Sequence, residues 1–159
     1  MWTQVAIVVS LAILAGGACK NSLPVPDGDL AAELAIPTTE DRVFDPATLR
    51  GKPALVVFAR SGCPYCTNEL PAAQRAGAAT NANVVAVYLW SGKEAALEVT
   101  KAAGFTQPVL IDDGRLGHKL AIRAVPYTVV LGADGRARQA FRGEQSEATL
   151  REALADARD

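Results

Sequence analysis

The chain has 159 residues, of which 50% are hydrophobic and 21% are charged, a composition typical of a globular protein rather than a disordered one. This length suits one ordinary domain with an N-terminal appendage. The formal net charge of −1 argues against nucleic acid as the main partner, because phosphate binding needs a surplus of positive charge.

Residues 1–19 are predicted to direct export of the chain. An apolar stretch broken only by Ser10 leads to small residues just ahead of Cys19, which is the layout of a secretory signal and its cleavage site. As a helix, this stretch reaches only about 25 Å against a hydrocarbon core of about 30 Å. The placement of Cys19 also resembles the lipobox of bacterial lipoproteins, although Gly16 stands where a lipobox usually has Leu. Lipidation of Cys19, an uncleaved membrane anchor and simple cleavage remain open, and each of them exports the rest of the chain.

Residues 20–35 contain prolines and polar side chains with little periodicity. This pattern predicts a linker, with the folded domain spanning residues 36–159.

The domain shows a regular succession of strand and helix patterns. Two continuous apolar runs, 54–59 and 84–90, predict strands that are buried on both faces of a sheet. Asp134-Gly135 predicts a hairpin turn, and Ser146 is placed to cap the last helix. The remaining patterns predict helices over 64–79, 93–103, 115–122 and 147–157 and further strands over 109–111, 127–131 and 137–141. The order predicts an α/β fold with parallel central strands and an antiparallel pair at the end.

The sequence Cys63-Pro64-Tyr65-Cys66 lies where the first predicted strand gives way to a helix. At a helix start, unpaired backbone N–H groups and the helix dipole favour the thiolate of Cys63, which makes it the attacking sulfur. Cys66 lies three residues on, on the same helical face, and can resolve a mixed disulfide with the substrate. This cycle needs no cofactor besides the cysteine pair.

Several alternatives use the same two thiols. Zinc needs four ligands, and only Cys19 and His118 are available as further soft ligands. A purely structural disulfide with three-residue spacing closes too small a loop to stabilise much. A copper metallochaperone or sensor would hold the metal with the cysteine pair and His118. A peroxidase is disfavoured because no separate peroxidatic cysteine is present outside the export segment.

The segment from Phe58 to Cys66, followed by Glu69-Leu70-Pro71, resembles the active-site segment of the thioredoxin superfamily, especially its exported TlpA/ResA-type thiol-disulfide oxidoreductases. Further matches are Gly51-Lys52-Pro53, Ala124-Val125-Pro126 and Gly132-Ala133-Asp134-Gly135-Arg136, so the resemblance covers about residues 38 to 158. It implies a thioredoxin-like fold with a mixed central sheet flanked by helices.

The resemblance also implies neighbours for the two thiols. Pro126 is expected to be a cis-proline beside them, with the backbone of Val125 presented to an extended substrate that also meets Pro64 and Tyr65. Glu69 matches an acid that tunes proton transfer in ResA-like members, although an acid on a helix can also lie on its solvated face. The family's aromatic residues near the first cysteine are missing, because Ala59 and Gly62 take their places.

The sequence therefore predicts an enzyme that exchanges thiols and disulfides with protein substrates, in the reducing direction, with cytochrome c maturation as one setting and copper handling as the alternative. We expect a membrane redox donor, a monomer, no metal, no nucleic acid, and a place on the periplasmic side of the bacterial cell envelope. The direction of electron flow and the roles of Arg60 and His118 stay open at this point.

Overall fold

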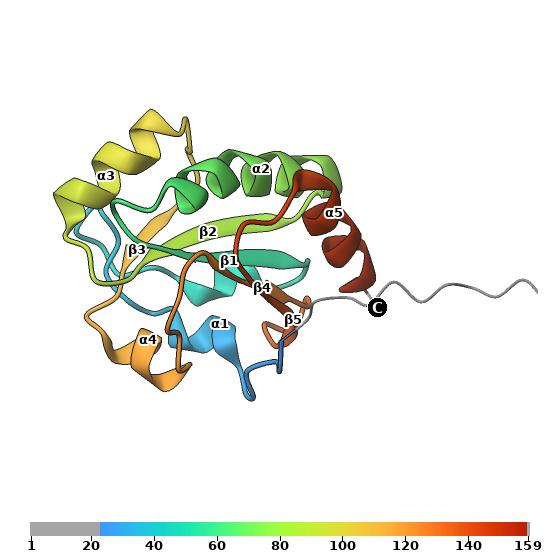
Figure 1. Ribbon diagram of the computed structural model, residues 1–159. Helices are drawn as coiled ribbons and strands as arrows, with labels where there is room; N and C mark the ends of the chain where they lie inside the picture. Colours follow the sequence, from blue (N-terminus) through green and yellow to red (C-terminus); the bar gives the residue numbers. More distant parts are fainter. Residues whose placement is uncertain (1–22, 159) are drawn as a thin grey trace, which may run out of the picture.

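The computed structural model describes residues 23–158 and shows a five-stranded sheet with helices on both faces (Figure 1). The strands are β1 (Ala54–Ala59), β2 (Asn83–Tyr88), β3 (Val109–Ile111), β4 (Tyr127–Leu131) and β5 (Ala137–Arg142), in the sheet order β3-β2-β1-β4-β5. β1 is parallel to β2, and β2 to β3, whereas β4 is antiparallel to both β1 and β5. The predicted mixed sheet with parallel central strands is confirmed.

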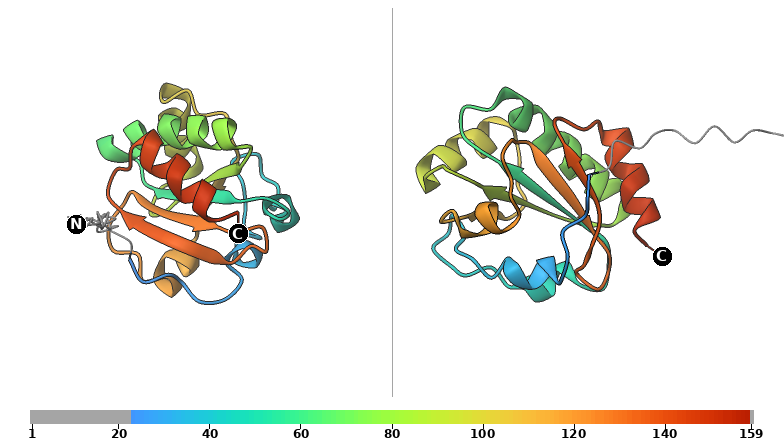
Figure 2. Two further views of the ribbon diagram at one scale, coloured as in Figure 1. Left: turned by 90° about the vertical axis from the view of Figure 1, so that its right-hand side faces the viewer. Right: turned by 60° about the horizontal axis from the view of Figure 1, so that its bottom comes forward.

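The helices divide between the two faces of the sheet. One face carries α2 (Pro64–Thr80), α3 (Lys93–Ala102) and α5 (Glu147–Asp156). The other face carries α1 (Leu30–Glu33), the 3₁₀ helix η1 (Pro46–Leu49) and α4 (Arg115–Lys119), and the right-hand view of Figure 2 brings it forward. From β1 onward the order of elements is the one that the sequence predicts.

β1 lies at the centre of the sheet and contributes to both hydrophobic cores. Leu55, Val57 and Ala59 face the core beneath α2 and α5, while alternate residues face the core on the α1 and α4 side. All six residues of β1 are completely buried. The continuous apolar run thus has the expected cause, since a strand with helices on both faces has no solvent-facing side.

The ends of two elements differ from the sequence prediction by two or more residues. β2 stops at Tyr88, and the exposed Trp90 has a φ of +52°, a backbone conformation that ends a strand. α4 ends at Lys119, earlier than the predicted helix. α2 continues through Pro71, so this proline does not break the helix.

The N-terminal boundary of the domain is a correction to the predicted linker over 20–35. Residues 30–33 form α1, capped by Asp29, and Leu30 and Leu34 are buried in the core. The N–H of Ala31 donates to the carbonyl of Gly135 over 3.0 Å, which ties α1 to the β4–β5 turn. A four-residue helix is too short to show periodicity, and tertiary contacts stabilise it instead. The domain therefore begins ahead of the predicted Ile36.

The predicted export segment 1–19, with Cys19, lies outside the described residues. Residues 20–22 of the predicted linker also lie outside them. Within residues 23–158, no helix combines the length and the apolar character needed to cross a membrane.

Candidate active site

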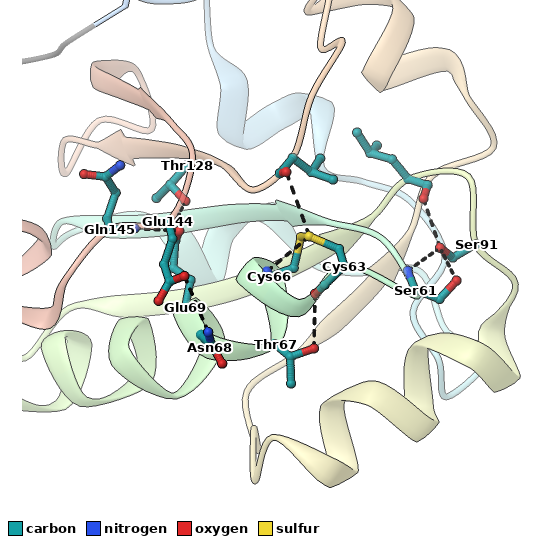
Figure 3. The surroundings of a disulfide bond; sticks show 12 residues. Ser61, Cys63, Cys66, Thr67, Asn68, Glu69, Ser91, Thr128, Glu144 and Gln145 are labelled. Atoms are coloured by element: carbon teal, nitrogen blue, oxygen red, sulfur yellow. Dashed lines mark hydrogen bonds between the residues drawn. A yellow bond between two sulfur atoms is a disulfide. The ribbon is translucent and has the colours of Figure 1, made fainter.

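Cys63 stands at the turn between β1 and α2. Gly62 reverses the chain with a φ of +70°, Cys63 is the N-cap of α2, and Pro64 occupies the first helical position. The Sγ of Cys63 accepts a hydrogen bond from the N–H of Cys66 over 3.2 Å (Figure 3). This sulfur therefore occupies the place of a helix-capping oxygen, where the N–H groups and the helix dipole stabilise negative charge.

Cys63 and Cys66 form a disulfide with a Cα–Cα distance of 5.3 Å. Cys63 keeps 7% of its surface exposed, whereas Cys66 is completely buried. Cys63 is therefore the more accessible residue of the pair. The roles of Cys63 as the attacking sulfur and of Cys66 as the resolving sulfur stay predictions.

The segment before β4 lies directly against the disulfide. The Val125–Pro126 peptide bond is cis, the isomer expected from the resemblance. The carbonyl oxygen of Val125 lies 3.9 Å from the Sγ of Cys63. Tyr65, from the first turn of α2, is 64% exposed beside this segment, and the two line a common pocket. The structure therefore brings together the residues predicted to contact substrate, and their role in binding stays a prediction.

Glu69 lies inside the protein rather than on the solvated face of α2. Its side chain is completely buried one helical turn after Cys66. One carboxylate oxygen accepts a hydrogen bond from the hydroxyl of Thr128, and the other accepts one from the N–H of Gln145 over 2.9 Å (Figure 3). Loss of hydration raises the pKa of Glu69 to about 7, against the opposing effect of these two hydrogen bonds. The group is therefore poised to exchange protons near neutral pH.

The sequence reasoning did not identify Thr128 and Gln145. They lie 59 and 76 residues from Glu69 along the chain, and no local motif marks them. A contact between the loops after β1 and β2 was also missed, in which the Oγ of Ser91 accepts from the N–H of Ser61 over 2.9 Å. The register that brings β4 beside β1 is what places Thr128 near α2.

His118 lies on α4 and lines a different pocket, with Trp90 and Arg123. In the described part of the chain, no three or more His, Cys, Asp or Glu side chains are grouped so that they could hold a metal ion. Cys63, Cys66 and His118 therefore do not form such a group, and copper binding by the two thiols stays an alternative prediction. Arg60, whose role the sequence leaves open, is exposed.

The thioredoxin-like domain family matches residues 41–158 of this chain. No curated protein sequence matches this chain.

Solved structures give further likenesses. A secreted disulfide oxidoreductase of Mycobacterium tuberculosis, described as homologous to E. coli DsbE, is 25% identical with a TM-score of 0.71, over 81% of this chain and 99% of that one. StoA from Bacillus subtilis is 24% identical with a TM-score of 0.61, over 75% and 93% of the two chains. A thiol:disulfide interchange protein of the thioredoxin family from Chlorobium tepidum is 21% identical with a TM-score of 0.67, over 76% and 90%. The similarity to StoA and to the Chlorobium tepidum protein shows that both share the fold of this chain.

Proposed function

The chain belongs to the thioredoxin-like domain family, and we propose that it works as a thiol–disulfide oxidoreductase on protein substrates through Cys63 and Cys66. One observation carries this proposal. The two sulfurs form a disulfide at the start of α2, where Cys63 keeps 7% of its surface exposed next to the pocket-lining Val125 and Cys66 is completely buried. This asymmetry is what a two-step exchange requires, because only one sulfur of the pair should meet the substrate.

In the reducing direction, the thiolate of Cys63 attacks one sulfur of a substrate disulfide. The substrate S–S bond breaks, a bond forms between Cys63 and the substrate, and the departing substrate sulfur takes up a proton. The thiolate of Cys66 then attacks the Sγ of Cys63 and releases the second substrate thiol. Two electrons pass to the substrate and the Cys63–Cys66 disulfide remains, so the cycle uses no cofactor besides this pair.

Cys66 is buried and must lose its proton before the second step. Glu69 lies one turn further along the same helix, and a pKa of about 7 keeps a useful fraction of its carboxylate ionised at neutral pH. We assign to Glu69 the role of accepting this proton, directly or through a water molecule. Its hydrogen bonds from Thr128 and Gln145 hold the carboxylate in place.

The substrate segment is proposed to lie extended along Val125 and Pro126, with Pro64 and Tyr65 on the other side of Cys63. The proximity of the Val125 carbonyl to the Sγ of Cys63 and the exposure of Tyr65 support this placement.

The reducing direction, a role in cytochrome c maturation and a membrane redox donor rest on the resemblance to TlpA- and ResA-type proteins. The apolar segment ahead of Cys19 supports export to the periplasmic side of the envelope, with attachment through an uncleaved anchor or a lipid on Cys19. We propose that the chain acts there as a monomer.

The test is reduction of the disulfides of insulin by the full-length chain, with dithiothreitol as the source of electrons. Cys63→Ser should reduce the rate to background, and Cys66→Ser should accumulate the mixed disulfide with substrate. Cys19→Ser is the matched control, because it removes a cysteine outside the proposed centre. A Cys63→Ser protein with full activity would overturn the proposal.

The direction of electron flow is tested by measuring the reduction potential of the Cys63–Cys66 pair. It should lie nearer that of thioredoxin, about −270 mV, than that of DsbA, about −120 mV.

A further inference from the structure

A pocket of about 540 Å³ opens next to the redox pair, because its lining includes Val125, whose carbonyl oxygen lies 3.9 Å from the Sγ of Cys63. It is built from three separate segments: the first turn of α2, the strand entry before β4, and the connection between β5 and α5. Its lining residues are Tyr65, Val125, Pro126, Gly143, Glu144 and Ser146. A substrate that is joined to Cys63 has to place the residues next to its own cysteine in or near this pocket.

The β5–α5 connection holds Glu144 at a defined place on the rim. Gly143 turns with a φ of +83°, and its N–H donates to the carbonyl of Pro126 over 2.8 Å. On the other side of Glu144, the N–H of Gln145 donates to Glu69 and the hydroxyl of Ser146 caps α5. Both neighbours of Glu144 are therefore fixed by the hydrogen bonds of the site itself, and its carboxylate stands close to Glu69 (Figure 3).

Glu144 has no charge partner in the described chain. Its carboxylate accepts one long hydrogen bond of 3.5 Å, from the amide of Asn68, and no Lys or Arg of residues 23–158 lies within ion-pair distance of it. The side chain is exposed, and so is the aromatic ring of Tyr65 across the pocket. A carboxylate next to an open aromatic face is suited to a Lys or Arg side chain, which can pair with the first and pack on the second.

We propose that Glu144 is a specificity-determining residue, which favours substrates that carry Lys or Arg within one or two positions of the reacting cysteine. This inference rests on the proposed function, since it concerns the substrate of the same exchange. A basic side chain in the pocket gains an ion pair with Glu144, whereas an acidic one meets an uncompensated negative charge.

The ion pair between a substrate cation and Glu144 also acts on Glu69, the proposed proton acceptor. Glu144 is one of the influences that raise the pKa of Glu69, because its negative charge disfavours a second charge nearby. A substrate cation beside Glu144 offsets this repulsion and favours the ionised form of Glu69. Binding of a basic substrate thus favours the state of Glu69 that can accept the proton of Cys66.

The test uses three peptides that differ at one position, with Lys, Gln or Glu next to a cysteine held in a disulfide with a chromophoric thiol. The kcat/KM of the full-length chain is measured for each at low salt, with dithiothreitol as the source of electrons and the uncatalysed rate subtracted. We expect a preference of about 10-fold for the Lys over the Glu peptide, from one attraction and one repulsion at an exposed site. The preference should shrink in high salt, which screens exposed charges.

Variants of the chain complete the test. Glu144→Gln should bring the Lys-to-Glu ratio close to one, and Glu144→Arg should reverse it. Glu98→Gln, which removes an exposed acid on α3, is the matched control and should keep the wild-type ratio. If the wild-type chain reduces all three peptides equally, or if Glu144→Gln keeps the preference, this inference is overturned and the proposed function stands. If dithiothreitol reduces the peptides and the chain does not accelerate this reaction for any of them, the proposed function itself fails.

Discussion

Thr128 donates its hydroxyl hydrogen to the carboxylate of Glu69, and both side chains are completely buried between β4 and α2. A carboxyl group is seldom found in such a place without a cation. Here two hydrogen bonds replace the cation, and they compensate only part of the lost hydration, so the pKa of Glu69 stays raised at about 7. The two predictions that follow concern this pair.

Glu69→Gln should change how stability depends on pH. In the unfolded chain Glu69 loses its proton near its ordinary value of 4.5, whereas the folded chain keeps it to about 7. Between these values the folded state binds more protons, so the free energy of unfolding of the wild type falls as pH rises through this window. At about 1.4 kcal/mol per pKa unit, the loss is at most about 3.5 kcal/mol.

Urea unfolding of wild type and Glu69→Gln at several pH values measures this difference. Glutamine resembles the protonated acid, so the variant should lack the fall. Glu98→Gln, at an exposed position, serves as the control and should follow the wild type. A wild-type chain whose stability relative to Glu69→Gln is constant from pH 4.5 to 7 would contradict the assignment.

Thr128→Val should raise the pKa of Glu69 above about 7. The hydroxyl of Thr128 stabilises the ionised carboxylate, and its removal leaves the burial unchanged while one stabilising hydrogen bond is lost. Carbon-13 NMR of the glutamate carboxyl groups, followed over pH, measures the shift. Thr128→Ser keeps a hydroxyl and should titrate near the wild-type value, and equal titration of the two variants would rule out a role for the hydroxyl.

Gly135→Ala should destabilise the fold more than Gly51→Ala. Both glycines have left-handed backbone, with φ of +81° and +84°, which costs an alanine about 1–2 kcal/mol. A Cβ on Gly135 would also lie 2.7 Å from the Cβ of Ala31, whereas a Cβ on Gly51 would meet nothing within 4 Å. Overpacking against α1 should add about 1–3 kcal/mol. Chemical denaturation measures the free energy of unfolding of both variants. Equal losses of stability would show that α1 can shift away from the added Cβ without a free-energy penalty.

Tyr88→Phe should stabilise the protein. Tyr88 is completely buried, and its hydroxyl finds no hydrogen-bond partner among the described residues. Leaving such a group buried and unpaired costs about 1–3 kcal/mol, so its removal should raise the free energy of unfolding by about 1 kcal/mol. Tyr65→Phe removes an exposed hydroxyl and should leave stability unchanged. A loss of stability in Tyr88→Phe would show that the hydroxyl is in fact satisfied.

By itself, the sequence determined the elements of the sheet and the place of the redox pair. Strand and helix patterns are repeated over short stretches, and the cap formed by Cys63 depends only on residues within one helical turn of it. The four-residue helix α1 has no periodicity of its own, and the sequence therefore predicts linker there.

Only the tertiary structure decided the surroundings of the two thiols. The burial of Glu69 and its bonds from Thr128 and Gln145 join segments 59 and 76 residues apart, and the pocket with Glu144 needs three segments at once. Desolvation and long-range hydrogen bonds depend on which strands become neighbours, and no local pattern encodes that order. On sequence alone, Glu69 could equally have faced solvent. It is buried because β4 pairs with β1.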